Sequence, residues 1–291
     1  MEKYNRTDLA LERVKKDGGS FSATLLKEEN IKGITVSNIS VKNNGKEEMY
    51  VTISRNKIWD TEEEERETAV EIISEEIKNM IGDLCAKKIA SDFSALIIGL
   101  GNADITADAI GPLTVKNLIV TRHFKELEPN LFFGLETCEV SAFSPGVLGQ
   151  TGIETVELIR GAVKSSSPDI VIAVDALAAR SCERLASVVQ ISNCGINPGS
   201  GIGNRRKAIN FESIGVPVIG IGVPTVVNSS TLVYDVLNKA GIQDVGQEIE
   251  EVLKSGISFF VTPKESDVIS NRTAKLIADS INRALDIRII C

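Results

Sequence analysis

The sequence predicts an α/β protein whose central sheet is at least partly parallel and buried on both faces. From residue 93 onward, short apolar runs alternate with segments of helical periodicity. Strands that are almost continuously apolar and separated by helices are typical of a sheet covered on both sides. The 291 residues allow one large domain or two ordinary ones. Because no repeat, low-complexity tract or linker divides residues 60–291, we predict a single domain over residues 1–291.

The first expected elements are a hairpin and a long helix. Residues 31–54 alternate apolar and polar positions around the turn signal Asn44-Gly45, which predicts a β-hairpin. A helix follows, with Thr61 as its expected cap and apolar residues at helical spacing after it. The acidic run at residues 62–65 is interpreted as the solvated start of this helix, where the helix dipole favours carboxylates, and not as a metal site.

The remaining elements follow from residue 93 onward. Strands are predicted at residues 95–100, in part of 131–140, and at 169–174, 187–192 and 216–223. Helices are predicted near residues 112–124, 151–164, 176–186, 229–240, 245–255 and 264–285. In sheets of this kind, ligands and catalytic groups gather beyond the carboxyl ends of the parallel strands.

Composition narrows the choice of partners and compartment. The formal net charge is −8 and the isoelectric point is near 5.0, which disfavours a broad nucleic-acid-binding surface but allows a local basic site. The five cysteines are scattered and form no C-x-x-C pair, so we expect a reducing, cytoplasmic location. The N-terminal segment is charged throughout and no later segment is apolar for long enough, so we expect neither a signal peptide nor a membrane anchor.

The chain contains a single histidine, His123. A two-histidine zinc motif is therefore excluded, and a Ser-His-Asp or Cys-His mechanism would depend on this one residue. His123 follows a predicted helix near its C-terminus, where a cation is favourable, so we expect a structural role for it. Carboxylates become the default acid and base. Among the cysteines, only Cys194, in a long glycine-rich loop, merits a test of reactivity.

The loop GLGNADITADAIGP, residues 99–112, first suggests a phosphate-binding turn. The third glycine of a dinucleotide motif would fall at Asp104, whose charge opposes a pyrophosphate, and no P-loop motif occurs in the chain. Nucleotide binding is therefore not expected. Asp108 lies in the same strand-to-helix turn and is either a local cap or a group that does chemistry.

Asp175 follows the apolar run of residues 169–174, at the expected end of a strand. It either caps a helix that begins at Ala176 or is a catalytic carboxylate at the mouth of the sheet. If the strands that bear Asp108 and Asp175 are neighbours, their loops share one cleft. Two carboxylates in one cleft can divide the labour, because one can activate water as a base while the other donates a proton to the leaving group.

Two further glycine-rich loops, residues 144–155 and 192–210, do not fit a phosphate signature. The second is long and polar, and it carries Arg205, Arg206 and Lys207. Such a loop could hold an extended acidic chain through backbone groups and basic side chains. Taken alone, it is better interpreted as a turn with a solvated cluster of charge.

Seven stretches that run almost from end to end resemble the spore germination protease family, the endopeptidases that degrade small acid-soluble spore proteins in germinating spores. They are RTDLALE (6–12), GLGNADITADAIGP (99–112), VTRH (120–123), SPGVLGQTGIET (144–155), VIAVDALAARS (171–181), GINPGSGIGN (195–204) and PVIGIGVPTVV (217–227). Together these stretches are far more specific than any one glycine pattern.

The resemblance implies a three-layer α/β/α fold with a mixed, mostly parallel sheet, similar to the hydrogenase maturation proteases, to which the hairpin of residues 31–54 is an accessory. It also implies a homotetramer in the forespore and germinating spore, made as an inactive zymogen that cuts itself near its N-terminus. The family's catalytic aspartates correspond to Asp108 and Asp175, the two carboxylates already singled out. Its processing point corresponds to the bond between Asp8 and Leu9, so residues 1–8 are expected to be a short propeptide.

Substrates follow from the same resemblance. We expect small acid-soluble spore proteins as substrates, and neither a cofactor nor a metal. Such substrates are DNA-bound, but the negative charge of this chain argues against DNA as its own ligand. The candidates for substrate binding in the glycine-rich loops are Gly101, Asn102, Gly199, Ser200, Gly201 and Arg205.

Two alternatives remain open. A metallopeptidase on the same scaffold would need His123 or a mostly oxygen site, which is a weak environment for zinc but suits a harder ion. A non-catalytic protein would instead capture acidic or extended peptides through residues 192–210 and would release no fragments.

Overall fold

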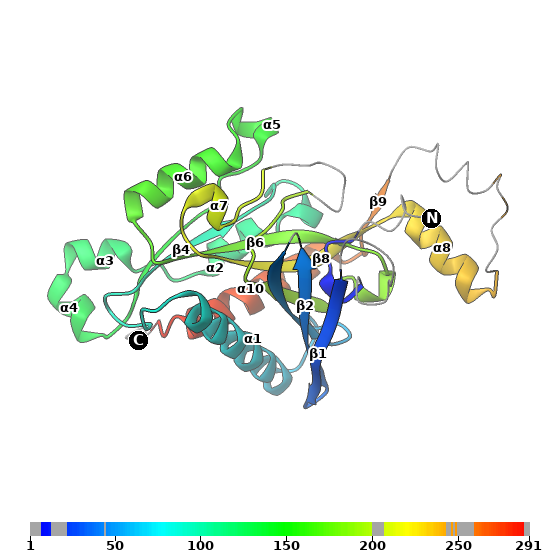
Figure 1. Cartoon of the computed structure of the whole chain (residues 1–291), viewed down its shortest axis with the longest axis horizontal. Helices are drawn as coiled ribbons and strands as arrows, with labels where there is room; N and C mark the ends of the chain where they lie inside the picture. The colour runs from blue at the N-terminus through cyan, green and yellow to red at the C-terminus, as the bar shows by residue number, and fades with distance from the viewer. Residues whose placement is uncertain are drawn as a thin grey trace.

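A computed structural model describes residues 7–12, 22–43, 45–199, 207–242, 246, 248 and 259–287 (Figure 1). These residues are organised around one nine-stranded sheet in the order β1-β2-β3-β7-β8-β6-β4-β5, with β9 paired to β8. The strands are β1 (Ser22–Ile31), β2 (Ile34–Asn43), β3 (Lys46–Ser54), β4 (Ser94–Gly99), β5 (Glu139–Phe143), β6 (Ile170–Ala179), β7 (Val188–Ser192), β8 (Val218–Asn228) and β9 (Phe260–Val261).

Helices connect most of the strands from β4 onward. They are α1 (Glu63–Leu84), α2 (Ile110–Asn117), α3 (Arg122–Leu127), α4 (Pro129–Gly134), α5 (Leu148–Thr151), α6 (Thr155–Ser166), α7 (Phe211–Ile214), α8 (Ser229–Lys239) and α10 (Ser266–Ala284). Among the described residues there are also the 3₁₀ turns η2 (Ala10–Glu12), η3 (Thr106–Asp108) and η4 (Cys182–Arg184). Within the described ranges, no helix is both long and apolar enough to cross a membrane.

The sheet is mixed, and its two halves differ in strand direction. β5, β4, β6 and β8 are parallel to one another, whereas β1, β2, β3 and β7 are joined by antiparallel pairs, as are β7 and β8. The predicted α/β class and mixed sheet are confirmed. The expectation of a mostly parallel sheet holds for one half only, because the N-terminal strands extend the same sheet through the pairing of β3 with β7.

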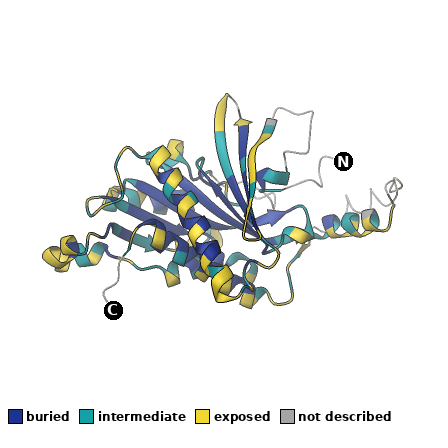
Figure 2. Ribbon diagram, turned by 90° about the horizontal axis from the view of Figure 1, so that it is seen from below, coloured by how far each residue is buried: buried dark blue, intermediate teal, exposed yellow. Residues whose placement is uncertain are grey.

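The predicted hairpin of residues 31–54 is present as β2 and β3, with Gly45 at a φ of +81° in the turn. An additional strand, β1, was not predicted. It pairs with β2 through a turn at Lys32 and Gly33, both of which have positive φ. Two consecutive residues of positive φ are typical of the tight turns that match the twist of a hairpin. β1 is mostly exposed, which is why its sequence shows little apolar alternation (Figure 2).

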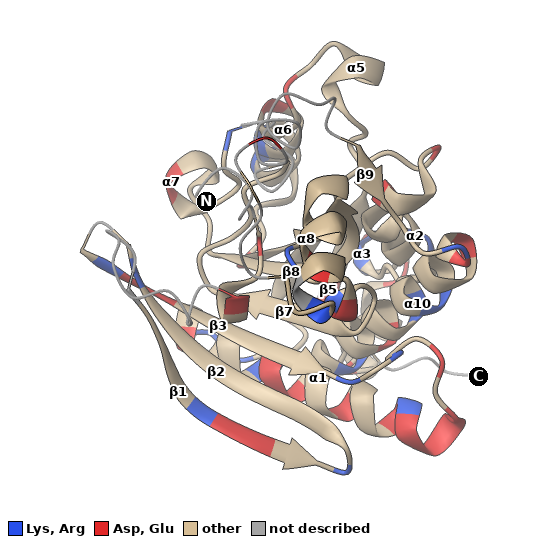
Figure 3. Ribbon diagram, turned by 90° about the vertical axis from the view of Figure 1, so that its right-hand side faces the viewer, with Lys and Arg blue, Asp and Glu red and all other residues tan. Residues whose placement is uncertain are grey.

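Helices cover both faces of the sheet, so the three-layer arrangement is confirmed (Figure 1). On one face, α1, α2 and α10 bury apolar side chains such as Ile73 and Ile277 against the sheet. On the other face, α6 and α7 contribute Ile159 and Ile214 to a second core over β4, β6 and β8. The outward side of α1 is rich in glutamates, including three in its first turn, where the helix dipole favours them (Figure 3).

Several predicted element boundaries were wrong. The helix expected at residues 176–186 is absent, because β6 continues through Ala179 and is followed only by η4. α1 begins at Glu63, with Glu62 rather than Thr61 as its N-cap and no side-chain cap. Much of the segment 131–140 belongs to α4, and the strand starts only at residue 139. The helix predicted at residues 245–255 lies almost wholly outside the described residues.

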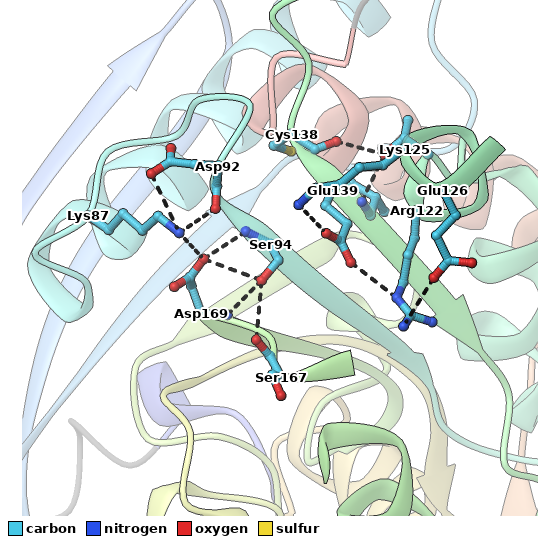
Figure 4. Close-up of polar contacts among 12 residues, drawn as sticks. Lys87, Asp92, Ser94, Arg122, Lys125, Glu126, Cys138, Glu139, Ser167 and Asp169 are labelled. Atoms are coloured by element: carbon cyan, nitrogen blue, oxygen red, sulfur yellow. Dashed lines mark hydrogen bonds and ion pairs between the residues drawn. The ribbon is translucent and has the colours of Figure 1, made fainter. Parts of the chain in front are cut away.

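Ion pairs and hydrogen bonds hold the starts of the parallel strands (Figure 4). Beside the first residue of β6, the Asp169 carboxylate accepts from the Ser94 N–H at 2.8 Å and pairs with Lys87 at 3.0 Å. At the start of β5, the Glu139 carboxylate pairs with Lys125 at 2.7 Å and with Arg122 at 3.1 Å. These contacts fix the amino edge of the sheet, opposite the loops that were expected to carry chemistry.

Candidate active site

Asp108 lies at the end of η3, in the connection between β4 and α2. Its carboxylate oxygen Oδ2 accepts a hydrogen bond from the Asn102 N–H at 2.8 Å. Gly101 has a φ of +110°, and a Cβ atom there would overlap the backbone oxygen of Asp108. Only glycine therefore allows this loop to close around the aspartate. The glycine that resembled a nucleotide-binding residue instead makes room for Asp108.

Hydroxyl groups from two distant elements hold η3 in place. Thr225 of β8 donates to the Ala107 carbonyl oxygen at 2.6 Å. Ser270 of α10 donates to the Thr106 carbonyl oxygen at 2.9 Å. Because these carbonyl groups directly precede Asp108, the two hydroxyls fix the backbone that carries its carboxylate.

Asp175 lies within β6 rather than at its end, which corrects its predicted position. It pairs with Gly222 of β8, and β6 continues past it. The side chain is 5% exposed, and its Oδ1 accepts from the Ala176 N–H at 2.9 Å. The alternative that Asp175 caps a helix beginning at Ala176 was therefore wrong, since Ala176 is also part of the strand. Burying a carboxylate costs free energy unless its surroundings stabilise it, so Asp175 is an unusual residue in the interior of an apolar strand.

The strands that lead to the two aspartates are parallel neighbours. β4 and β6 pair from Ala95 with Ile170 to Gly99 with Val174, and β6 then continues while the chain after β4 turns toward Asp108. Asp108 and Asp175 consequently line the same cavity, which has a volume of about 450 Å³. Other residues that line it are Asp8, Gly101, Gly146, Val147, Thr155 and Gly199.

The candidate substrate loops have different places around this cavity. Gly101 and Gly199 line it. Asn102 does not. Its side-chain oxygen accepts from Gln150 at 2.9 Å, which ties the loop of residues 144–155 to the loop of Asp108, and from the Asp104 N–H at 3.0 Å. The other three candidates, Ser200, Gly201 and Arg205, lie outside the described residues.

The N-terminal segment also reaches the cavity, through Asp8. The Asp8 N–H donates to the Ala178 carbonyl oxygen at 3.1 Å, and its Oδ2 accepts from the Ala178 N–H at 3.0 Å. Leu9 is fully buried among apolar side chains that include Leu177 and Val188. The N-terminal segment thus runs as an extended peptide along the last residues of β6, beyond the point where β6 pairs with β4.

Comparison with known proteins identifies the family. Residues 5–252 match the family model described as germination protease. The chain belongs to the germination protease family. The germination protease of Caldanaerobacter subterraneus subsp. tengcongensis is 41% identical over 310 residues, which cover 96% of this chain and 94% of the relative. That of Bacillus velezensis is 42% identical (84% and 69% covered), and that of Priestia megaterium is 40% identical (87% and 71% covered).

Membership in the germination protease family supports a peptidase activity for this chain. His123 does not line the cavity, and it lies in the first turn of α3 rather than at the end of a helix, so the predicted dipole interaction was wrong. Burial raises the pKa of the Cys194 thiol, which donates to the Tyr50 hydroxyl at 3.1 Å, and this disfavours a reactive thiolate.

No group of three or more His, Cys, Asp or Glu side chains among the described residues has the arrangement of a metal site. Two residues that the sequence did not single out are Thr225, which lines the cavity, and Gln190, whose Nε2 donates to the carbonyl oxygen of Asp8. Gln190 lies inside the apolar strand β7, and a polar residue at a buried strand position was the only available signal.

Proposed function

We propose that the chain is an endopeptidase that starts the degradation of small acid-soluble spore proteins at germination. The observation that carries the proposal is that Asp108 and Asp175 line one cavity, which the N-terminal segment reaches through Asp8. Asp108 follows β4, and Asp175 lies within β6, the parallel neighbour of β4. The resemblance to the family's motifs adds the substrate class. It also adds a homotetramer in the forespore and germinating spore, which light scattering of the purified protein would test.

The proposed reaction is hydrolysis by water without a covalent intermediate. One carboxylate of the pair is ionised and takes a proton from water, whose oxygen attacks the carbonyl carbon of the peptide bond. The other carboxyl group is protonated and gives its proton to the nitrogen as the C–N bond breaks. The products are a new carboxyl group and a new amine. The roles of base and acid are assigned to the pair of Asp108 and Asp175, not to either residue singly.

The same site is proposed to cut the chain's own bond between Asp8 and Leu9. Asp8 lines the cavity together with both aspartates, and Leu9 is anchored in an apolar cluster. This placement supports a zymogen in which residues 1–8 are removed by the protein itself. The expected product is a chain that begins at Leu9.

The decisive variant for the loop of η3 is Asp108→Asn, which keeps the shape of the side chain and removes its ability to act as an acid or a base. We expect cleavage of a small acid-soluble spore protein to fall by at least about 1,000-fold, as for other essential members of a catalytic group. The matched control is Asp104→Asn in the same loop, because Asp104 is exposed and does not line the cavity. Fragments are followed by mass spectrometry.

The same assay separates the alternatives. A metallopeptidase would lose activity on exhaustive chelation and regain it with added metal, whereas the proposed aspartate pair predicts unchanged activity. A non-catalytic binder would retain the spore protein on size-exclusion chromatography but would yield no fragments from it. Normal turnover of both Asp108→Asn and the Asp104→Asn control would refute the role of Asp108 as a catalytic carboxylate.

A further inference from the structure

The side-chain amide of Gln190 brackets one residue of the N-terminal segment. Its Nε2 donates to the Asp8 carbonyl oxygen at 3.1 Å, and its Oε1 accepts from the Ala10 N–H at 2.7 Å. These two backbone groups flank Leu9, so the amide pairs with the peptide as a neighbouring strand would. Gln190 is itself buried, with 6% of its surface exposed, so a polar side chain at this position needs such partners.

Gln190 and Asp175 lie in one row across the sheet. Gln190 of β7 is paired with Gly222 of β8, which is paired with Asp175 of β6. Residues directly paired across neighbouring strands point to the same face of a sheet. Two strand spacings separate the Cα atoms of Gln190 and Asp175 by roughly 10 Å. Gly222 has no side chain, and Leu177, which packs against Leu9, occupies the space a Cβ would need.

The peptide is held on both sides of the bond between Asp8 and Leu9. Before the bond, Asp8 makes two hydrogen bonds with the backbone of Ala178. After it, the Glu12 carboxylate accepts from the backbone N–H groups of Arg180 at 2.9 Å and Ser181 at 3.2 Å. The carbonyl oxygen that contacts Gln190 therefore belongs to a peptide bond whose position is fixed from either end.

We infer that Gln190 is a catalytic residue, whose Nε2 donates a hydrogen bond to the carbonyl oxygen of the peptide bond that is cut. The inference rests on the proposed cleavage between Asp8 and Leu9. When water adds to the Asp8 carbonyl carbon, negative charge develops on this oxygen, and a donor already in place stabilises it without reorganisation. Oε1 holds the Ala10 N–H at the same time, so the amide cannot turn its oxygen toward the carbonyl.

The test uses the freshly purified full chain and measures the rate at which residues 1–8 are lost, by intact-mass spectrometry. Gln190→Ala removes the donor, and we expect the rate to fall by about 100- to 1,000-fold, as for other single donors to such an oxygen. The control is Thr52→Val. Thr52 is paired with Gln190 across β3 and β7, and its buried hydroxyl has no hydrogen-bond partner, so we expect the parent rate within twofold.

Gln190→Glu separates donation from packing, because it keeps the length and shape of the side chain. As a carboxylate it accepts from Ala10 but cannot donate to the Asp8 oxygen, whereas the protonated acid can donate. The ratio of its rate to the parent rate is therefore expected to rise at least 10-fold from pH 8 to pH 5. A residue that only supports the fold would leave this ratio constant.

The outcomes separate this inference from the proposed function. Loss of self-cleavage in Asp175→Asn together with a normal rate in Gln190→Ala would overturn the role of Gln190 and leave the aspartate pair intact. A ratio for Gln190→Glu that does not change with pH would also overturn it, even if Gln190→Ala failed to fold. Normal cleavage in Asp175→Asn would refute the proposed function itself.

Discussion

The two edges of the parallel strands place carboxylates in different surroundings. At the amino edge, Asp169 and Glu139 accept hydrogen bonds and pair with lysine and arginine side chains (Figure 4). Beyond the end of β4, at the other edge, Asp108 and Asp175 line a cavity together with Asp8 of the N-terminal segment. Acids of the same type are therefore paired with cations at one edge and line a cavity at the other.

Among changes that leave the polar side chains of the candidate site in place, the largest expected effect comes from the turn that makes room for Asp108. Gly101→Ala adds a Cβ that overlaps the Asp108 backbone oxygen, at a φ that side chains rarely adopt. The loop must shift, and a displacement of about 1 Å at a catalytic group can lower turnover about 100-fold. Kinetics of peptide cleavage measure this.

The control for that variant is Gly134→Ala at the end of α4, where an added Cβ meets nothing within 4 Å. It should cleave at the parent rate. Full activity of Gly101→Ala would show that peptide cleavage does not depend on the position of Asp108.

A smaller effect is expected from the hydroxyl that supports η3. Thr225→Val removes the hydrogen bond to the Ala107 carbonyl oxygen and should lower kcat about 10-fold, with a loss of about 1 kcal/mol in the free energy of unfolding. Thr273→Val is the matched control, since that buried hydroxyl has no partner, and it should change neither quantity. Equal kinetics of the two variants would show that the Thr225 hydroxyl does not position η3 for cleavage.

At the amino edge the expected effect is on stability alone. Glu139 is 13% exposed and pairs with two cations, so Glu139→Gln should lower the free energy of unfolding by about 1 kcal/mol. Cleavage should stay within twofold of the parent rate. Denaturant unfolding and cleavage kinetics on the same sample measure both quantities. A large loss of turnover in a folded Glu139→Gln variant would show that the amino edge also affects cleavage.

The smallest effects are expected from the thiols. Burial raises the pKa of Cys138 to about 12 and also raises that of Cys194. Since the thiolate is the reactive form and a raised pKa leaves less of it at a given pH, both thiols should react with iodoacetamide slowly at pH 7 and faster as the pH rises. Cys194→Ser should cleave normally. Rapid labelling of Cys194 at pH 7 would contradict this.

The fold was predictable wherever local pattern and tertiary structure agree. The periodicity of α1 and the apolar runs of β4, β7 and β8 mark these elements directly in the sequence. The C-terminal half of β6 was not predictable, because the alanines and leucine after Asp175 favour a helix in isolation and become a strand only by pairing with β8. The strand β1 was missed because it is largely exposed and lacks a buried face.

The candidate site shows the same division. Asp108 could be selected because it follows an apolar strand and a glycine turn, and Asp175 because it interrupts an apolar run. Gln190 could not be selected, since its partners Asp8 and Ala10 are 182 and 180 positions away in the sequence. Contacts between residues so far apart depend on the order of strands in the sheet, which local sequence does not encode.

The most direct test of the central claim compares an aspartate within β6 with the aspartate just before this strand. Asp175→Asn and Asp169→Asn make the same chemical change at the cavity and beside the first residue of this strand, and the cleavage rate of a small acid-soluble spore protein is measured for both. We expect a loss of at least about 1,000-fold for Asp175→Asn and a rate within a few fold of the parent for Asp169→Asn. Near-normal cleavage by Asp175→Asn would contradict the central claim.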